Sequence, residues 1–252
     1  MKKLLGMLTL LLAGTAAAAE LHVAVAANFL GPLQQLAPVY ERTSGHKLLP
    51  SAGASGQLYA QIRQGAPFDV FLSADHERPQ QLEAEGLAVA GSRFTYATGR
   101  LALWSPKAGA LGSDGASFLK GGNYRFLAIA NPKTAPYGLA AQQVLQKLQL
   151  WDSLNEQKKL VTGESIAQTQ QFAATGNADA AFVAVSQILK PDGSIDGSNW
   201  LPPTDLYEPI DQDCVLLTRS TEQGAARDFL RWLKNDAQAL KIIRAAGYTV
   251  RP

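Results

Sequence analysis

The chain has 252 residues, of which 46% are hydrophobic and 17% charged, a composition typical of a globular protein rather than a disordered or fibrous one. Its 23 Lys and Arg residues nearly balance its 21 Asp and Glu residues. No basic field therefore attracts nucleic acid or an anionic membrane, and we expect neither as a partner. The single cysteine, Cys214, lies in an apolar strand-like run. We expect a buried thiol there rather than a nucleophile or a disulfide.

The first 19 residues have the pattern of a secretory signal peptide. Lys2 and Lys3 precede an apolar core over Leu4–Ala13, and Ala17–Ala19 supplies a small-residue cleavage pattern before Glu20. The core is shorter than the roughly 20 residues that span a bilayer, so we expect cleavage rather than membrane insertion. No cysteine follows the small residues, so we expect an exported protein without a lipid anchor.

After this segment, short apolar runs alternate with amphipathic helical patterns. The pattern predicts strands at 21–26, 47–50, 69–73, 101–105, 126–130, 159–161, 180–185 and 214–218. It predicts helices that begin near Phe29 and Leu58, and further helices at 80–85, 139–148, 166–174, 222–234 and 237–245. This alternation is typical of the α/β class, in which helices cover both faces of mostly parallel sheets.

We expect two lobes, each a mostly parallel sheet flanked by helices. Residues 20–96 and 212–252 would form lobe 1, and residues 97–211 would form lobe 2. The chain would pass between them near 95–99 and again near 208–211, which gives a two-strand hinge. Because ligands of such sheets bind beyond the carboxyl ends of the strands, the expected site is the cleft between the lobes.

At four places an apolar run ends in a small or polar residue and a helical pattern starts at once. These junctions lie around Asn28, Ser55, Tyr137 and Ile166. A helix start leaves its first N–H groups without intrahelical partners and carries a partial positive charge. Four such starts in one cleft would bind an anion without any Lys or Arg.

Each junction residue also has a purely structural interpretation. Asn28 can cap the helix near Phe29 or turn its N–H donors toward a ligand. Ser55 can be an N-cap, a ligand donor, or both. For Tyr137 we expect a backbone N–H contact with the ring as a packing wall, and the apolar Ile166 also points to a backbone contact.

The sequence offers little support for an enzyme. Neither Ser55 nor Ser165 matches the G-x-S-x-G nucleophile motif. The three histidines, His22, His46 and His76, lack the spacing of a metal site or a catalytic triad. No nucleotide-binding glycine motif is present, and we expect no cofactor. An exported serine hydrolase that uses Ser55 with a histidine is a remote alternative.

Five segments give the chain a clear resemblance to a known family. It resembles the periplasmic molybdate-binding proteins of ABC-type importers along nearly the whole chain after the signal. The segments are VAVAANFLGPLQQLA (23–37), SAGASGQLYAQIRQGAPFDVFLSAD (51–75), GSRFTYATGRLALWS (91–105), NPKTAPYGLAAQQVLQKL (131–148) and AAGYTV (245–250).

The resemblance implies a two-lobed periplasmic-binding-protein fold that closes over one tetrahedral dianion held by neutral donors. Transferred to this sequence, the ligand positions are Asn28, the hydroxyl and backbone of Ser55, and the backbone N–H groups of Tyr137 and Ile166, with Ala27 contributing through its backbone. The resemblance also implies molybdate and tungstate as ligands, a membrane permease as partner and the periplasm as location. We expect a monomer.

Two positions depart from the family pattern and keep alternatives open. Some members have a hydroxyl residue where this chain has Ala27, and some have a tyrosine where it has Ala184. A sulfate, thiosulfate or phosphate carrier on the same scaffold is an alternative, as is a regulatory or structural protein with an emptied cleft. No Asp or Glu lies at the expected contact positions, although Glu164 is adjacent to one. Their absence favours a fully deprotonated anion over phosphate.

Overall fold

The computed structural model describes residues 18–112 and 114–250. The predicted signal peptide, apart from Ala18 and Ala19, lies outside these residues. Within the described ranges, no helix is both long enough and apolar enough to cross a bilayer.

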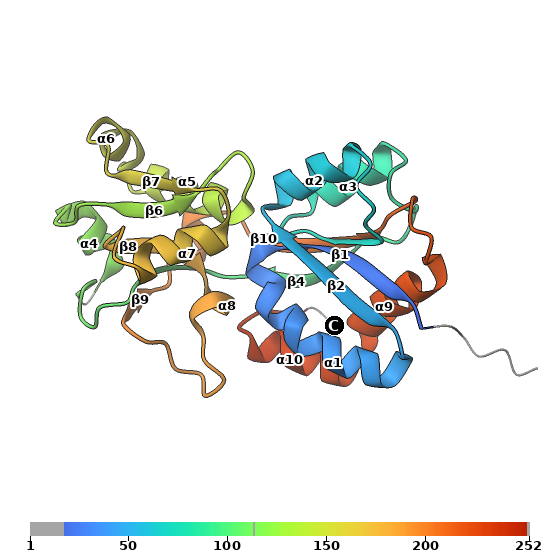
Figure 1. Cartoon of the computed structure of the whole chain (residues 1–252). Helices are drawn as coiled ribbons and strands as arrows, with labels where there is room; N and C mark the ends of the chain where they lie inside the picture. The colour runs from blue at the N-terminus through green and yellow to red at the C-terminus, as the bar shows by residue number, and fades with distance from the viewer. Residues whose placement is uncertain (1–17, 113, 251–252) are drawn as a thin grey trace, which may run out of the picture.

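Two five-stranded sheets form two lobes that lie side by side (Figure 1). The sheet of lobe 1 has the order β2-β1-β3-β10-β4, and that of lobe 2 has the order β7-β6-β8-β5-β9. The strands of lobe 1 are β1 (Glu20–Ala26), β2 (Lys47–Gly53), β3 (Val70–Leu72), β4 (Phe94–Gly99) and β10 (Ile210–Leu216). Those of lobe 2 are β5 (Leu101–Ser105), β6 (Leu127–Ala130), β7 (Leu160–Gly163), β8 (Ala180–Ala184) and β9 (Ser198–Trp200).

Each sheet has a parallel half and an antiparallel half. In lobe 1, β1 runs parallel to β2 and β3, whereas β10 is antiparallel to β3 and β4. In lobe 2, β6 runs parallel to β7 and β8, whereas β5 is antiparallel to β8 and β9. The predicted α/β class and two-lobed fold are confirmed. The sheets are not mostly parallel as predicted, because the strands that enter or leave each lobe pair antiparallel.

Helices cover both sheets and two 3-10 turns complete the fold. The helices are α1 (Leu30–Ser44), α2 (Ser55–Arg63), α3 (Glu77–Ala84), α4 (Gly115–Gly121), α5 (Pro136–Lys147), α6 (Trp151–Glu156), α7 (Ile166–Ala174), α8 (Val185–Ile188), α9 (Gln223–Asn235) and α10 (Ala237–Ala245). The 3-10 turns are η1 (Ala27–Phe29) and η2 (Thr204–Leu206). The sequence pattern predicted the longer helices, but not α4, α6, α8 or the short strand β9.

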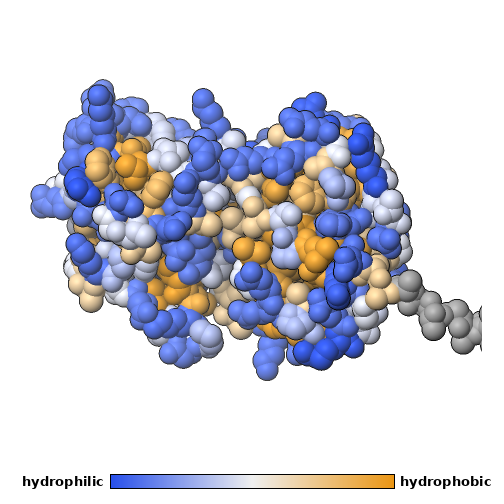
Figure 2. Space-filling model, in the orientation of Figure 1, coloured by the Kyte–Doolittle hydropathy of each residue, from blue (hydrophilic) through white to orange (hydrophobic). Residues whose placement is uncertain are grey.

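Alternating residues of the strands supply the cores. On β1, Val23 and Val25 pack with Leu36 of α1 on one face of the sheet, and Ala24 packs with Leu58 of α2 on the other. Both faces of the sheet are therefore buried under helices, which explains why its central strands read as continuous apolar runs. Polar residues lie around the outline of both lobes, with apolar residues exposed in smaller patches between them (Figure 2).

The chain passes from lobe 1 to lobe 2 between β4 and β5. Gly99 ends a strand of one sheet, and Leu101 begins a strand of the other. The chain returns before β10, which starts at Ile210, four residues earlier than the strand predicted from the sequence at 214–218. The exact lobe boundaries at 96/97 and 211/212 stay a prediction.

Candidate functional site

The four predicted junctions all fall at the ends of parallel strands. In lobe 1, Ala26 of β1 lies opposite Gly53 of β2, so η1 and α2 start next to each other. In lobe 2, Ala130 of β6 lies opposite Gly163 of β7, so α5 and α7 start from the same edge of that sheet. The carboxyl ends of parallel strands meet at one edge, which is why helix starts far apart in sequence come together.

These helix starts line a small pocket between the lobes. All five predicted positions line it. The lining residues are Ala26, Ala27, Asn28, Gly53, Ala54, Ser55, Ala74, Ala135, Pro136, Tyr137 and Ile166. Among the residues that the structure describes, no Asp, Glu, Lys, Arg or His lines this pocket. The arrangement can bind a small anion through N–H and O–H donors alone.

Ser55 lies at the first position of α2 and not at its N-cap, which is Ala54. It is 1% exposed, and its Oγ accepts a hydrogen bond from the backbone N–H of Ala74, at 2.9 Å. The N-cap interpretation of Ser55 is therefore wrong. The bond from Ala74 engages an oxygen lone pair and leaves the hydroxyl proton available for donation into the pocket.

Asn28 uses its side chain within the protein. Its Nδ2 donates to Gln212 Oε1 at 3.0 Å and to Tyr248 Oη at 2.9 Å. It caps no helix, because neither η1 nor α1 has a side-chain cap bond and η1 already contains Asn28. The predicted capping role is wrong, and both amide hydrogens are occupied away from a ligand. What Asn28 can offer an anion is its backbone N–H at the start of η1.

In lobe 2 the pocket is lined by helix starts with buried apolar or aromatic side chains. Tyr137 is 1% exposed and packs in the core of lobe 2, as expected for a wall residue. The next residue is Gly138, where a Cβ atom would lie 2.2 Å from the carbonyl oxygen of Ala130. Only glycine lets α5 start this close to the end of β6.

Ile166 is the first residue of α7, and Ser165 is the N-cap. The Ser165 side chain accepts a hydrogen bond from the N–H of Gln168, at 3.3 Å. Ser165 thus satisfies a deeper N–H group of the helix, and the N–H of Ile166 remains one of the unpaired groups of a helix start.

The two alanines that depart from the family pattern lie in different places. Ala27 lines the pocket and can contribute only its backbone. Ala184 is fully buried at the end of β8, and its N–H donates to Gln187 Oε1 at 2.9 Å. Ala184 therefore contributes no donor to the pocket.

Hydrogen bonds across the cleft hold the lobes together at the pocket rim. The donors come from α2 and α3 of lobe 1 and the acceptors from lobe 2. The pairs are Gly56 N with Thr134 O at 2.8 Å, Gln57 Nε2 with Glu164 Oε2 at 3.1 Å, and Arg78 Nη2 with Lys133 O at 3.2 Å. The structure is thus the closed form of a two-lobed protein. Glu164, the acidic residue next to the predicted site, is engaged at this rim.

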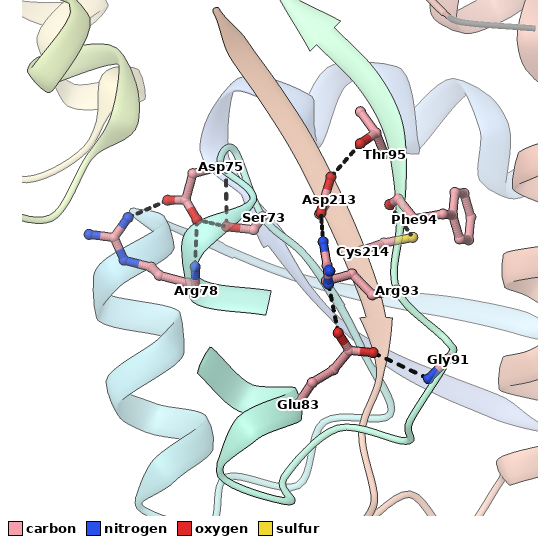
Figure 3. Close-up of polar contacts among 10 residues, drawn as sticks. All are labelled: Ser73, Asp75, Arg78, Glu83, Gly91, Arg93, Phe94, Thr95, Asp213 and Cys214. Atoms are coloured by element: carbon pink, nitrogen blue, oxygen red, sulfur yellow. Dashed lines mark hydrogen bonds and ion pairs between the residues drawn. The ribbon is translucent and has the colours of Figure 1, made fainter. Parts of the chain in front are cut away.

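Several charged side chains of lobe 1 are paired with one another (Figure 3). Asp75 forms an ion pair with Arg78 and also accepts its backbone N–H, at 3.0 Å. Arg93 bridges Asp213 at 2.8 Å and Glu83 at 2.6 Å. Asp213 has a side chain that is only 2% exposed, so its partner compensates a buried charge. None of these five charged residues lines the pocket.

Cys214 is fully buried on β10, and its thiol donates to the carbonyl of Phe94 at 3.6 Å (Figure 3). Burial raises the pKa of the Cys214 thiol well above its usual value, so the thiol stays protonated. The prediction of a buried thiol is confirmed. Within residues 18–112 and 114–250, no group of His, Cys, Asp and Glu side chains could hold a metal ion.

Comparison with known proteins places this geometry in a family. Residues 21–249 match the family described as bacterial extracellular solute-binding protein. The chain belongs to that family. It is 52% identical to the molybdate-binding protein ModA of Azotobacter vinelandii, over 94% of this chain and 93% of the relative. It is 49% identical to the molybdate-binding protein ModA of Rhodobacter capsulatus, over 94% of this chain and 91% of the relative.

The solved structures of the family include a near match in three dimensions. The periplasmic molybdate-binding protein of Azotobacter vinelandii superposes with a TM-score of 0.90 at 45% identity, covering 92% of this chain and all of that one. These relatives confirm the resemblance predicted from the sequence segments. The sequence pattern located the four helix starts that line the pocket but missed Gln212 and Tyr248, which hold Asn28 from strand β10 and the C-terminal segment.

Proposed function

We propose that this solute-binding protein captures molybdate, and also tungstate, in the periplasm and delivers it to the membrane permease of an ABC importer. The observation that carries the proposal is a closed pocket lined by four helix starts and the Ser55 hydroxyl, with no charged side chain among the lining residues described. A fully deprotonated oxyanion only accepts hydrogen bonds, and this pocket supplies only donors at its helix starts.

The relatives support both the ligand and the location. Two relatives that are 52% and 49% identical to this chain are named as molybdate-binding proteins. The solved structure from Azotobacter vinelandii is of a periplasmic molybdate-binding protein. We propose a monomer that needs no cofactor, with molybdate as cargo. In this proposal Asn28, Ser55, Tyr137 and Ile166 bind the oxyanion, and Ala27 adds its backbone N–H.

The pocket chemistry separates molybdate from phosphate more clearly than from sulfate. Near neutral pH phosphate carries a proton that needs an acceptor, and no carboxylate is found among the lining residues described. Sulfate has no such proton, so the protein must reject it through the size of the cavity. About five to seven hydrogen bonds to the dianion, at about 1.5–3 kcal/mol each, give ample gross attraction. Desolvation and closure offset part of it and leave a net of about −8 to −11 kcal/mol.

A hydrolase is not supported by the surroundings of Ser55. Its Oγ accepts from the backbone of Ala74, and within the described part of the chain no histidine lines the pocket. Without a neighbouring base a serine hydroxyl is a weak nucleophile. We therefore propose a binding protein without catalytic activity.

Isothermal titration of the anion-stripped mature protein tests the proposal. Molybdate, tungstate, sulfate and phosphate are titrated in parallel. We expect tight one-to-one binding of molybdate and tungstate and no heat from sulfate or phosphate. Heat from sulfate or phosphate alone would reassign the ligand, and silence from all four anions would indicate an emptied cleft.

A further inference from the structure

Behind the pocket lies a cluster of neutral polar side chains that joins the two lobes, and all of them are buried except the half-buried Ser186. It contains Asn28, Tyr96, Gln212 and Tyr248 of lobe 1 and Tyr137 and Ser186 of lobe 2. Two of its members, Asn28 and Tyr137, are also residues of the pocket. The cluster therefore connects the two sides of the proposed anion site from behind.

Gln212 on β10 is the member that links the two pocket residues directly. It is fully buried, its Oε1 accepts from Asn28 Nδ2 at 3.0 Å, and its Nε2 donates to Tyr137 Oη at 3.2 Å. Tyr96 adds a second donor to the same Oε1, at 3.0 Å. The carboxamide of Gln212 has a fixed length, and it thus bridges Asn28 in η1 of lobe 1 and Tyr137 in α5 of lobe 2.

A second set of bonds fixes Asn28 from lobe 2 and the C-terminal segment. Ser186 Oγ donates to the carbonyl of Asn28 at 2.9 Å. Tyr248 Oη accepts from Asn28 Nδ2 and donates to Ser186 Oγ, both at 2.9 Å. Asn28 is therefore held at both its side chain and its backbone, which leaves it little freedom to follow a smaller ligand.

The backbone between the lobes is shaped to admit this cluster. A Cβ atom at Gly99 would lie 2.0 Å from Tyr137 Oη and 2.6 Å from Gln212 Nε2. Gly99 is the last residue of β4, beside the point where the chain leaves lobe 1. Only glycine at this position allows the Gln212–Tyr137 contact to form.

The cluster carries no charge over the physiological pH range. Burial raises the pKa of Tyr137 and Tyr96 well above the usual value and raises the pKa of Tyr248 to about 12. The phenols therefore stay protonated, and the cluster places no negative charge behind the pocket that would repel the anion. A neutral cluster can fix distances without altering the electrostatics of the pocket.

We propose that Gln212 is a positioning residue that sets the separation of the Asn28 and Tyr137 sides of the closed pocket and so determines the size of oxyanion accepted. This inference rests on the proposed function, since it concerns how that site distinguishes dianions of equal charge. Sulfate is smaller than molybdate. With Gln212 in place, the lobes cannot close further to contact the smaller anion on all sides.

The test replaces Gln212 by methionine, which has similar length but cannot make these hydrogen bonds. Gln61→Met, the same change at an exposed position of α2, is the matched control. Molybdate affinity is measured by titration calorimetry, and the weaker affinity for sulfate is measured from the excess of sulfate needed to displace molybdate. We expect molybdate affinity to fall about tenfold or more in Gln212→Met while sulfate affinity falls less or rises, so that the molybdate-to-sulfate ratio decreases. Gln61→Met should keep both the affinity and the ratio.

The molybdate-to-sulfate affinity ratio distinguishes a positioning role from a loss of stability, because a loss of stability would weaken the binding of both anions together. An unchanged ratio in a folded Gln212→Met protein overturns the inference. If that variant does not fold, Tyr137→Phe decides, because it removes only the hydroxyl that Gln212 contacts, and it too should lower the ratio. Wild-type protein that binds no molybdate would overturn the proposed function itself, whereas tight wild-type binding with an unchanged variant ratio would overturn only the role of Gln212.

Discussion

The two lobes line the same pocket with different chemistry. Lobe 1 contributes two polar residues, Asn28 and Ser55, whose side chains are fixed by hydrogen bonds within that lobe. Lobe 2 contributes Tyr137 and Ile166, whose side chains pack in the core of lobe 2. An anion would therefore meet a hydroxyl and backbone N–H groups on one side and backbone N–H groups alone on the other.

This difference determines which experiments can probe each side. Substitution of polar side chains reports on lobe 1, because there the side chains either donate or hold the donors in place. The proposed donors of lobe 2 belong to the backbone, so ordinary substitutions change packing rather than hydrogen bonding. A scan limited to polar residues would leave half of the proposed site untested.

The largest effect is expected for Asn28→Asp in lobe 1. The change removes both donors to Gln212 and Tyr248 and places a buried negative charge next to the anion. We expect molybdate binding to weaken by about 3–5 kcal/mol, the range for an uncompensated buried charge. Titration calorimetry checks this, with the exposed Asn177→Asp as control for the added charge. Near-native affinity of the folded variant would contradict the position assigned to Asn28.

Ile166→Pro tests the backbone donor of lobe 2. Proline is tolerated at the first position of a helix, and Ser165 already has the extended conformation (φ −142°, ψ 166°) that precedes proline. The change removes the N–H proposed to contact the anion and should cost about 1.5–3 kcal/mol of binding, as measured by titration.

Two controls isolate the N–H of Ile166 from packing and from proline itself. Ile166→Val trims the side chain but keeps the N–H, and should bind nearly as wild type. Ala237→Pro places proline at the first position of α10, away from the cleft. Equal affinity of Ile166→Pro and Ile166→Val would show that lobe 2 does not bind through this group.

Ser55→Ala tests the hydroxyl donor of lobe 1. The variant loses the proposed bond to the anion and leaves the N–H of Ala74 without its acceptor. We expect a loss of about 1–3 kcal/mol in molybdate affinity. The exposed Ser194→Ala serves as the control. Unchanged binding would remove Ser55 from the site.

The smallest effect on binding is expected from pH. Burial raises the pKa of Tyr248 to about 12 and that of Tyr137 well above 10.0, so both phenols stay protonated up to pH 10.0. Affinity for molybdate should therefore be constant from neutral pH to that point, and a loss within this range would show that the cluster titrates.

Stability should respond to pH with a definite sign. The unfolded chain loses its tyrosine protons near pH 10.0, before the folded protein does. The native state then binds more protons than the unfolded state. The contribution of these tyrosines to the free energy of unfolding is therefore fully present below pH 10.0 and is lost as the pH rises above it. Denaturant titrations at several pH values measure this slope, and a rise in stability above that pH would contradict the sign.

Local pattern was enough to locate the helix starts, because a strand end and a helix start lie within a few residues of each other. The sequence thus placed Ser55 and Ile166 at the pocket. It could not assign the partners of the Asn28 side chain, since Gln212 is 184 residues away and Tyr248 is 220 residues away. These contacts depend on how the chain returns to lobe 1, which no local periodicity encodes.

A weaker signal for Gln212 was present in the sequence. The polar run from Asp211 to Asp213 precedes an apolar strand pattern, but the prediction ended the hinge at Asp211 and began the strand only at Cys214. In the structure, β10 begins at Ile210, and Gln212 and Asp213 are both buried. Polar residues inside a central strand indicate buried hydrogen-bond partners, which is a cue for a site rather than for a loop.

A crystal structure of the protein grown with molybdate, with diffraction data collected at the molybdenum absorption edge, tests the central claim most directly. We predict one anomalous peak between the lobes, with oxyanion contacts to the Ser55 hydroxyl and to the backbone N–H groups of Asn28, Ser55, Tyr137 and Ile166. No charged side chain should touch the anion. A peak outside this pocket, or an anion bound by Lys or Arg, would contradict the account.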